Sequence, residues 1–133
     1  MASLRLFIAK LRAWIRIKGR SLEGLFFTLR RVTGIILVIF LVIHLVDISL
    51  LTQGDEVYDN FIKGFLTPQA VAFEGVVLFS LIYHGVTGMY VAIVGAGLLL
   101  GRRKELAIVL FFVGLLALIA GFSFLLGKVA GHG

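Results

Sequence analysis

The chain has 133 residues, of which 60% are hydrophobic and 15% are charged, and it carries a formal net charge of +6 at pH 7. This apolar share is far above that of a soluble globular protein, so the composition predicts that lipid is the solvent for most of the chain. The absence of cysteine excludes disulfides, thiolate zinc sites and iron–sulfur ligation by this chain.

The first segment, SLRLFIAKLRAWIRIKGR (3–20), combines basic residues with Leu, Ile, Phe and Trp. This mixture predicts an amphipathic helix that lies along the membrane interface, with its bases near anionic headgroups. A mitochondrial presequence is the alternative interpretation, because such peptides are also basic and poor in acids, and residues 1–22 contain no acid.

Three apolar segments follow, each long enough to cross a bilayer, which takes about 20 residues. They cover residues 32–51, 70–100 and 106–126. Open strands would leave backbone groups unpaired in hydrocarbon, so all three segments are predicted to be helices. We therefore predict an all-α membrane protein with an interfacial segment (1–30), a three-helix transmembrane domain (31–127) and a short outer tail (128–133).

The basic residues gather on one side of the predicted membrane domain. Eight of them precede the first span, and Arg102, Arg103 and Lys104 follow the second. The loop between the first two spans has Lys63 as its single base, beside three acids. By the positive-inside rule the N-terminus faces the cytoplasm (or a mitochondrial matrix) and the C-terminus faces outward. This distribution favours a membrane over nucleic acid as the partner of the positive charge.

Two histidines lie deep inside predicted spans. His44 follows Arg31 by roughly 20 Å along a helix, and His84 precedes Arg102 by roughly 27 Å. Ionisable groups at such depth are costly, so they usually face protein, water or a cofactor. A neutral imidazole with one nitrogen hydrogen-bonded is the usual metal-ligand form, and haem iron is the metal centre that we expect in this setting. Both histidines are therefore candidate axial ligands.

The helical faces of these histidines favour the same interpretation. His84 shares its face with Ser80 and Gly88, and the glycine one turn away would leave the backbone clear for a flat macrocycle. Asp47 lies at one side of His44 on the first span. The alternative interpretation is plain helix packing, which small residues also mark, with the histidines bonded between helices.

Other glycines also suggest helix packing. Gly97 and Gly101 form a GxxxG pair, and Gly114 and Gly121 lie in the third span. Such residues let two backbones approach closely in a membrane.

A pair of arginines, Arg30 and Arg31, stands where the first span enters the membrane, within FFTLRRVTG (26–34). Guanidinium groups there suit an anionic or polarised partner. Lipid phosphate is the commonest such partner; haem propionates and a quinone carbonyl are the other candidates.

Three motifs together resemble the cytochrome b membrane-anchor subunit of succinate dehydrogenase, respiratory complex II. They are RVTG (31–34), HLVD (44–47) and YHGVTGM (83–89), and the resemblance covers roughly residues 22–100. It implies that Arg31, Thr33 and Gly34 match an Arg-x-Ser/Thr-Gly motif, and that His84 and Gly88 match the His-x-x-x-Gly motif of a haem ligand. His44 resembles the additional histidine of members that hold two haems.

The resemblance also implies cofactors and partners. These are haem b (one or two), a quinone, a second membrane-anchor subunit that supplies the opposite axial ligand, an iron–sulfur subunit and a flavoprotein subunit. The expected quinone-site residues are Arg31, Thr28 and Phe27, where Phe27 replaces the family's serine. Tyr90 stands where many members have arginine, so Arg30 is a candidate for a propionate contact.

We therefore expect a haem-binding anchor of succinate:quinone oxidoreductase in a prokaryotic cytoplasmic membrane, with the mitochondrial inner membrane as the alternative. Three other interpretations stay open. They are a haem-free structural anchor, a proton relay or transport subunit using His44, Asp47 and His84, and a single haem clamped by both histidines.

Overall fold

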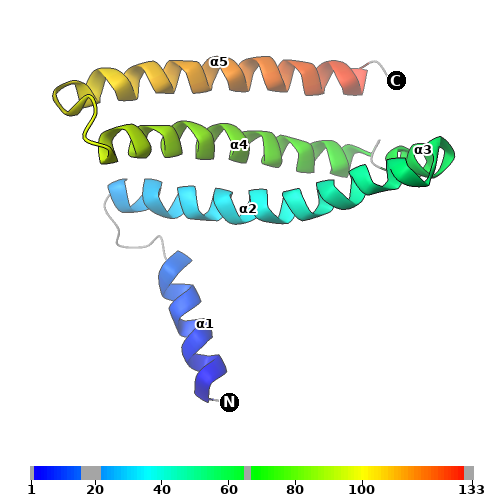
Figure 1. Cartoon of the computed structure of the whole chain (residues 1–133), viewed down its shortest axis with the longest axis horizontal. Helices are drawn as coiled ribbons and strands as arrows, with labels where there is room; N and C mark the ends of the chain where they lie inside the picture. Colours follow the sequence, from blue (N-terminus) through cyan, green and yellow to red (C-terminus); the bar gives the residue numbers. More distant parts are fainter. Residues whose placement is uncertain (1, 16–21, 65–66, 131–133) are drawn as a thin grey trace.

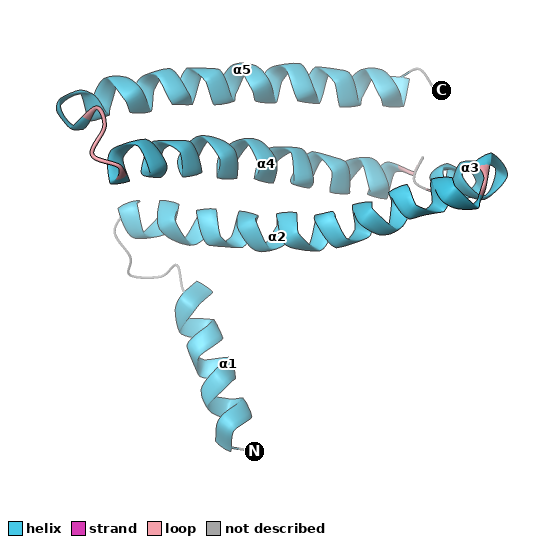
Figure 2. Cartoon of the chain, viewed as in Figure 1, coloured by secondary structure: helices cyan, strands magenta, loops and turns pink. Residues whose placement is uncertain are grey.

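The described part of the chain is almost entirely helical. The computed structural model describes residues 2–15, 22–64 and 67–130. The helices are α1 (Ala2–Ile15), α2 (Leu22–Leu50), α3 (Asp55–Lys63), α4 (Pro68–Gly95) and α5 (Arg103–Ala130), with single 3-10 turns η1 (Leu51–Gln53) and η2 (Leu100–Arg102). Figure 2 shows no strand among these residues. The predicted all-α fold with three candidate membrane spans is confirmed.

The three long helices lie side by side in one row, with α4 between α2 and α5 (Figure 1). Successive helices run antiparallel, so the start of α2 and the connection from α4 to α5 share one end of the row. We call this the basic end, because Arg30, Arg31, Arg102, Arg103 and Lys104 belong to it. At 1.5 Å per residue each long helix measures roughly 42 Å, which exceeds a hydrocarbon core of about 30 Å and allows tilt or projection beyond it.

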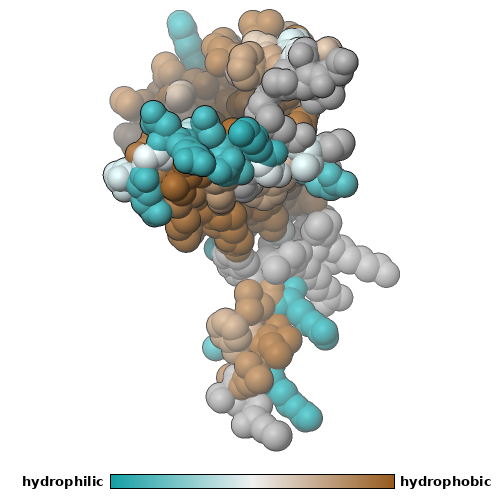
Figure 3. Space-filling model, turned by 90° about the vertical axis from the view of Figure 1, so that its right-hand side faces the viewer, coloured by the Kyte–Doolittle hydropathy of each residue, from teal (hydrophilic) through white to brown (hydrophobic). Residues whose placement is uncertain are grey.

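Three polar side chains of the long helices are buried while many large apolar ones are exposed, which differs from the pattern of a soluble protein. Thr28, Thr33 and Ser80 are each at most 2% exposed, whereas most large apolar side chains of α2, α4 and α5 face outward. Figure 3 looks along the row from the α3 end, where hydrophilic residues gather, and shows apolar residues over the row behind them. Because lipid solvates an apolar exterior, this arrangement fits a multi-pass membrane protein.

Glycines in α5 allow close packing against α4, as predicted for Gly114 and Gly121. A Cβ added at Gly114 would lie 3.2 Å from Val86 Cγ2, and one at Gly121 would lie 2.6 Å from Leu78 Cδ2. The same prediction is wrong for the Gly97–Gly101 pair.

That pair does not lie on a membrane helix. The second long helix ends at Gly95 rather than near residue 100. Gly97 then takes a left-handed conformation (φ 78°) in the turn, and a Cβ added at either Gly97 or Gly101 would meet no atom within 4 Å. Gly97 therefore serves the turn, because its positive φ favours glycine.

Replacing Gly121 with Ile should destabilise the helix row by about 1–3 kcal/mol, the usual cost of overpacking. The added side chain would collide with Leu78 and push α4 away from α5. The measurement is the midpoint of thermal unfolding. Gly127→Ile is the matched control, because Gly127 lies in the same helix and has nothing within 4 Å of an added Cβ. Equal destabilisation by both variants would contradict this account of the packing.

The loop between the first two spans contains a helix that we did not predict. In α3, Asp55 and Glu56 stand in the first turn and Lys63 in the last, which complements the helix dipole. Gly54 enters the helix with φ 109°, a conformation that glycine adopts easily. This charge order was visible in the sequence and could have revealed the helix.

The predicted N-terminal helix is present as α1. It leaves the row near the start of α2 (Figure 1). Leu4, Phe7, Ile8 and Leu11 recur at helical spacing and are all exposed, with Arg5, Lys10 and Arg12 around them. Residues 16–20 of the predicted amphipathic segment lie outside the described residues. Location at a membrane interface stays a prediction.

Candidate functional site

His84 of α4 lies against α2, where its imidazole meets the backbone of the RVTG segment. Its Nδ1 is 3.0 Å from the carbonyl oxygen of Arg30. A carbonyl oxygen only accepts, so Nδ1 carries the hydrogen and donates it. The lone pair is then on Nε2, which makes no hydrogen bond to any described residue. This is the tautomer found in metal-ligating histidines whose other nitrogen is bonded to a backbone carbonyl.

Gly34 makes room for this imidazole. A Cβ added at Gly34 would lie 3.0 Å from Cε1 of His84 and 3.3 Å from Nδ1. Arg30 and Gly34 stand one helical turn apart, so the acceptor and the gap lie on one face of α2. The Thr33 hydroxyl lies 3.0 Å from the same Arg30 carbonyl and 2.9 Å from that of Leu29. Gly34 of the RVTG motif and His84 of the YHGVTGM motif are therefore direct neighbours.

A groove of about 350 Å³ opens beside His84 at the surface of α2. Its lining consists of Arg30, Arg31, Gly34, Ile35, Val38, Ile39 and His84. The structure thus brings together three predicted site residues, the two arginines and the histidine. The groove combines two cations with an apolar wall.

Phe27 holds the arginine head groups near this groove. Cζ of Arg31 lies 4.0 Å from the centre of the Phe27 ring, and Cζ of Arg30 lies 5.5 Å from it. Both distances fit cation–π attraction. The Phe27 ring is partly exposed, so the guanidinium groups stay at the surface of the helix rather than inside the row.

His44 forms a separate site farther along α2. It lies 14 residues beyond Arg30, roughly 21 Å along the helix axis. Its ring stacks on Phe40 with centroids 5.3 Å apart, and its Nδ1 lies 3.7 Å from Oδ2 of Asp47. The separation from Gly34, which His84 contacts, is roughly 15 Å along the axis, almost three turns. Two imidazoles so placed do not meet at one iron.

Comparison with known protein families covers both the RVTG and the YHGVTGM motif. The model of the family described as succinate dehydrogenase/fumarate reductase transmembrane subunit matches residues 12–124. The chain belongs to this family. A search of curated proteins found no match.

Membership confirms the resemblance seen in the sequence at the level of the family. Succinate dehydrogenase/fumarate reductase is an oxidoreductase complex, so this transmembrane subunit has other subunits as partners. The three apolar spans agree with a multi-pass location in a membrane.

Two predicted site residues of the subunit lie inside the helix row rather than at the groove. Thr28, 2% exposed, donates its hydroxyl hydrogen to the Gly24 carbonyl over 2.8 Å. Ser80 is 1% exposed, and its Oγ has no hydrogen-bond partner among the described residues. The surrounding side chains of the subunit cover both hydroxyls, so neither reaches the groove surface.

Gly88, unlike Thr28 and Ser80, borders open space in this subunit. A Cβ added there would meet no atom within 4 Å in the part of the chain that the structure describes. Packing inside this subunit therefore does not require glycine at position 88. The bare backbone one turn from His84 is available to a flat group or to another subunit.

Tyr83 is a neighbour of the site that sequence reasoning missed. Its hydroxyl donates to the Phe26 carbonyl over 3.1 Å, which joins α4 to α2 beside the His84 contact. The ring also stacks with Phe79 at 5.8 Å. The tyrosine immediately before the histidine in YHG was the available signal.

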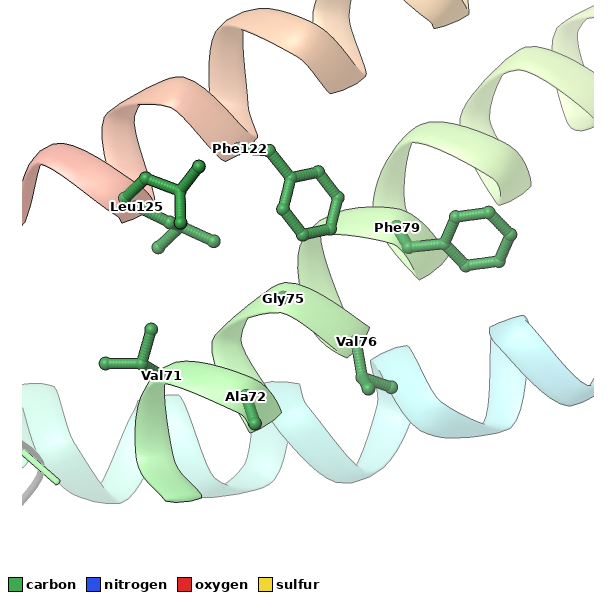
Figure 4. A pocket seen from close by; sticks show the side chains of 8 residues that line it. Val71, Ala72, Gly75, Val76, Phe79, Phe122 and Leu125 are labelled. Carbon is green, nitrogen blue, oxygen red and sulfur yellow. The ribbon is translucent and has the colours of Figure 1, made fainter. Parts of the chain in front are cut away.

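A larger hollow, about 450 Å³, lies between the first half of α4 and the last part of α5 (Figure 4). In Figure 4, Val71 of α4 points toward Leu125 of α5, and the Phe122 ring of α5 lies beside Gly75, while Phe79 lines the edge of the hollow. Its lining has no polar side chain, so it offers no group for chemistry. Within the described residues, no three His, Asp or Glu side chains gather to hold a bare metal ion. A metal in this subunit would need most of its ligands from elsewhere, as in a porphyrin.

Proposed function

We propose that this subunit is a haem b-binding membrane anchor of succinate:quinone oxidoreductase and forms part of its quinone site. His84 binds haem iron through Nε2, and His44 binds a second haem. Arg31, with Arg30 beside it, lines the quinone side. Bound haem b supplies a one-electron carrier between the iron–sulfur subunit and the membrane.

One observation carries this proposal. Nδ1 of His84 donates to the Arg30 carbonyl over 3.0 Å, which fixes the ring and leaves Nε2 as the ligating nitrogen. Gly34 and Gly88 support it, because one admits the imidazole and the other leaves open space one turn away. A haem-free role would require only a hydrogen bond and would not require the bare surface at Gly88.

The distance between the histidines supports two haems over one shared haem. His44 and Gly34, the residue of α2 that His84 contacts, lie almost three turns apart, which is too far for one iron. The same separation disfavours a proton relay that would pass directly from His44 and Asp47 to His84. Each histidine would then meet its opposite ligand on the second membrane-anchor subunit.

The positions of Arg30 and Arg31 are evidence for a quinone head group near the basic end. Arg31 lies on Phe27 and lines the same groove as His84. A guanidinium presents fixed donors that polarise a carbonyl and stabilise the oxyanion formed on reduction. Thr28 donates within its own helix, so the proposed quinone contact comes from Arg31 and the Phe27 ring rather than from the threonine hydroxyl.

Charge supports the orientation and the docking face. Arg30 and Arg31 lie at the same end of the row as Arg102, Arg103 and Lys104 (Figure 1). By the positive-inside rule this basic end faces the cytoplasm of a prokaryote, where the iron–sulfur and flavoprotein subunits would dock.

The haem content of the purified complex tests the proposal. A pyridine haemochrome assay should give two haems b per complex, and succinate should reduce quinone. A value of one haem per complex would overturn haem binding at His44 and leave the assignment to His84. A colourless complex that still reduces quinone would show a haem-free anchor and overturn the haem assignment.

Replacing Gly34 with Ala should lower haem affinity at His84 by about 10- to 100-fold, the usual effect of disturbing a ligand's hydrogen-bond partner. The new Cβ would displace the imidazole and lengthen its bond to Arg30. The measurement is the haem-to-protein ratio after dilution. Gly127→Ala is the control, because an added Cβ there meets nothing within 4 Å. Full haem retention in Gly34→Ala would contradict the contact.

A further inference from the structure

Three residues on successive turns of α2 form a small cluster away from the His84 groove. They are Phe40, His44 and Asp47. The Phe40 ring stacks on the imidazole at 5.3 Å with 14° between the planes. Oδ2 of Asp47 lies 3.7 Å from Nδ1 of His44, on the following turn. The imidazole thus lies between the Phe40 ring on its N-terminal side and the Asp47 carboxylate on its C-terminal side.

Among the residues that the structure describes, the Asp47 carboxylate has no other partner. Its Oδ1 is buried and makes no hydrogen bond within the described residues, and the side chain is 21% exposed. A carboxylate inside an apolar span is costly unless it is paired. Nδ1 of His44 lies 3.7 Å from Oδ2 of Asp47, within ion-pair distance, and a hydrogen bond between them requires the two side chains to approach by about 0.5 Å.

The imidazole of His44 is open on its remaining side, since its side chain is 45% exposed. A carboxylate that accepts Nδ1–H leaves Nε2 with its lone pair on a ring held by Phe40. His84 has a different partner at the same atom, the uncharged carbonyl of Arg30. The two histidines therefore differ in the charge of the group that faces Nδ1, which is a neutral carbonyl for His84 and a carboxylate for His44.

We propose that Asp47 is a positioning residue for His44, which sets the tautomer of its imidazole and lowers the reduction potential of the haem bound there. This inference rests on the proposed function, because it needs haem on His44. A carboxylate behind a ligating imidazole increases the basicity of the ligand. Its negative charge also favours ferric over ferrous iron, because the ferric centre carries one more positive charge.

The test is an optical redox titration of the purified complex with wild-type chain and with Asp47→Asn. The asparagine keeps an acceptor for Nδ1–H but removes the charge. We expect haem to be retained, and the ferrous-to-ferric ratio of the His44 haem at a given potential to rise about tenfold, which is 59 mV for a one-electron couple. The potential of the His84 haem should not move.

Two further variants separate the possible outcomes. Asp47→Ala removes the acceptor as well and should lower haem occupancy at His44 by about 10- to 100-fold. Asp59→Asn removes the same charge from exposed α3 and should leave both potentials unchanged. Unchanged potentials in Asp47→Asn, or equal shifts in the Asp59 variant, would overturn the role of Asp47 and leave the proposed function standing. A haem content that His44→Ala does not lower would instead overturn haem binding at His44 and this inference with it.

Discussion

Replacing His84 with Ala should remove one haem b absorption band from the reduced spectrum of the complex and leave the band of the His44 haem. The variant loses Nε2, the atom that we propose as the iron ligand. It also loses the Nδ1 bond to the Arg30 carbonyl, which helps to hold α4 against α2. The measurement is the reduced-minus-oxidised spectrum, with haem quantified per complex.

A second variant separates ligation from packing. Glutamine at position 84 carries an amide that can still donate to the Arg30 carbonyl, but an amide is a poor ligand for haem iron. We expect His84→Gln to assemble with its partners and to lack the same band. An unchanged spectrum in His84→Gln would show that the histidine serves only the contact between helices.

Replacing Arg31 with Leu should lower the rate of quinone reduction by about 10²-fold, the usual cost of removing one donor that stabilises a developing oxyanion. Electron transfer from succinate to a soluble dye should be unchanged, because that reaction does not use the groove. Haem content should also be unchanged.

Two matched variants make the Arg31 result specific. Arg31→Lys keeps the charge but loses the planar fork that stacks on Phe27, so it should recover only part of the rate. Arg102→Leu removes a charge from an exposed position at the same basic end and should have little effect on quinone reduction. If Arg102→Leu slows the reaction as much as Arg31→Leu, the effect belongs to general charge or docking rather than to the groove.

The membrane spans could be predicted from the sequence because hydropathy alone decides them. Each span is a long apolar run, and lipid leaves helix as the only way to satisfy its backbone. Helix ends were less predictable. The first long helix begins at Leu22, ten residues before the predicted span, because basic side chains do not stop a helix and can reach the interface. It therefore carries Thr28, Arg30 and Arg31 on the same rigid element as His44.

The site was only partly predictable, because a sequence shows which residues share a helical face but not which face meets another helix. Arg30, Arg31 and His84 were selected for their chemistry, and the structure brings them to one groove. Ser80 shares the helical face of His84, yet its side chain is buried inside the helix row. The contact of His84 with Gly34 depends on the register between α2 and α4, which no local pattern encodes.

In the proposed site, haem iron binds Nε2 of His84 while Nδ1 donates to the Arg30 carbonyl. A density map of the assembled complex tests it most directly. We expect porphyrin density bonded to Nε2 beside Gly88, with the imidazole still in contact with Gly34. Density for a lipid tail or for a side chain of another subunit against Nε2 would contradict it.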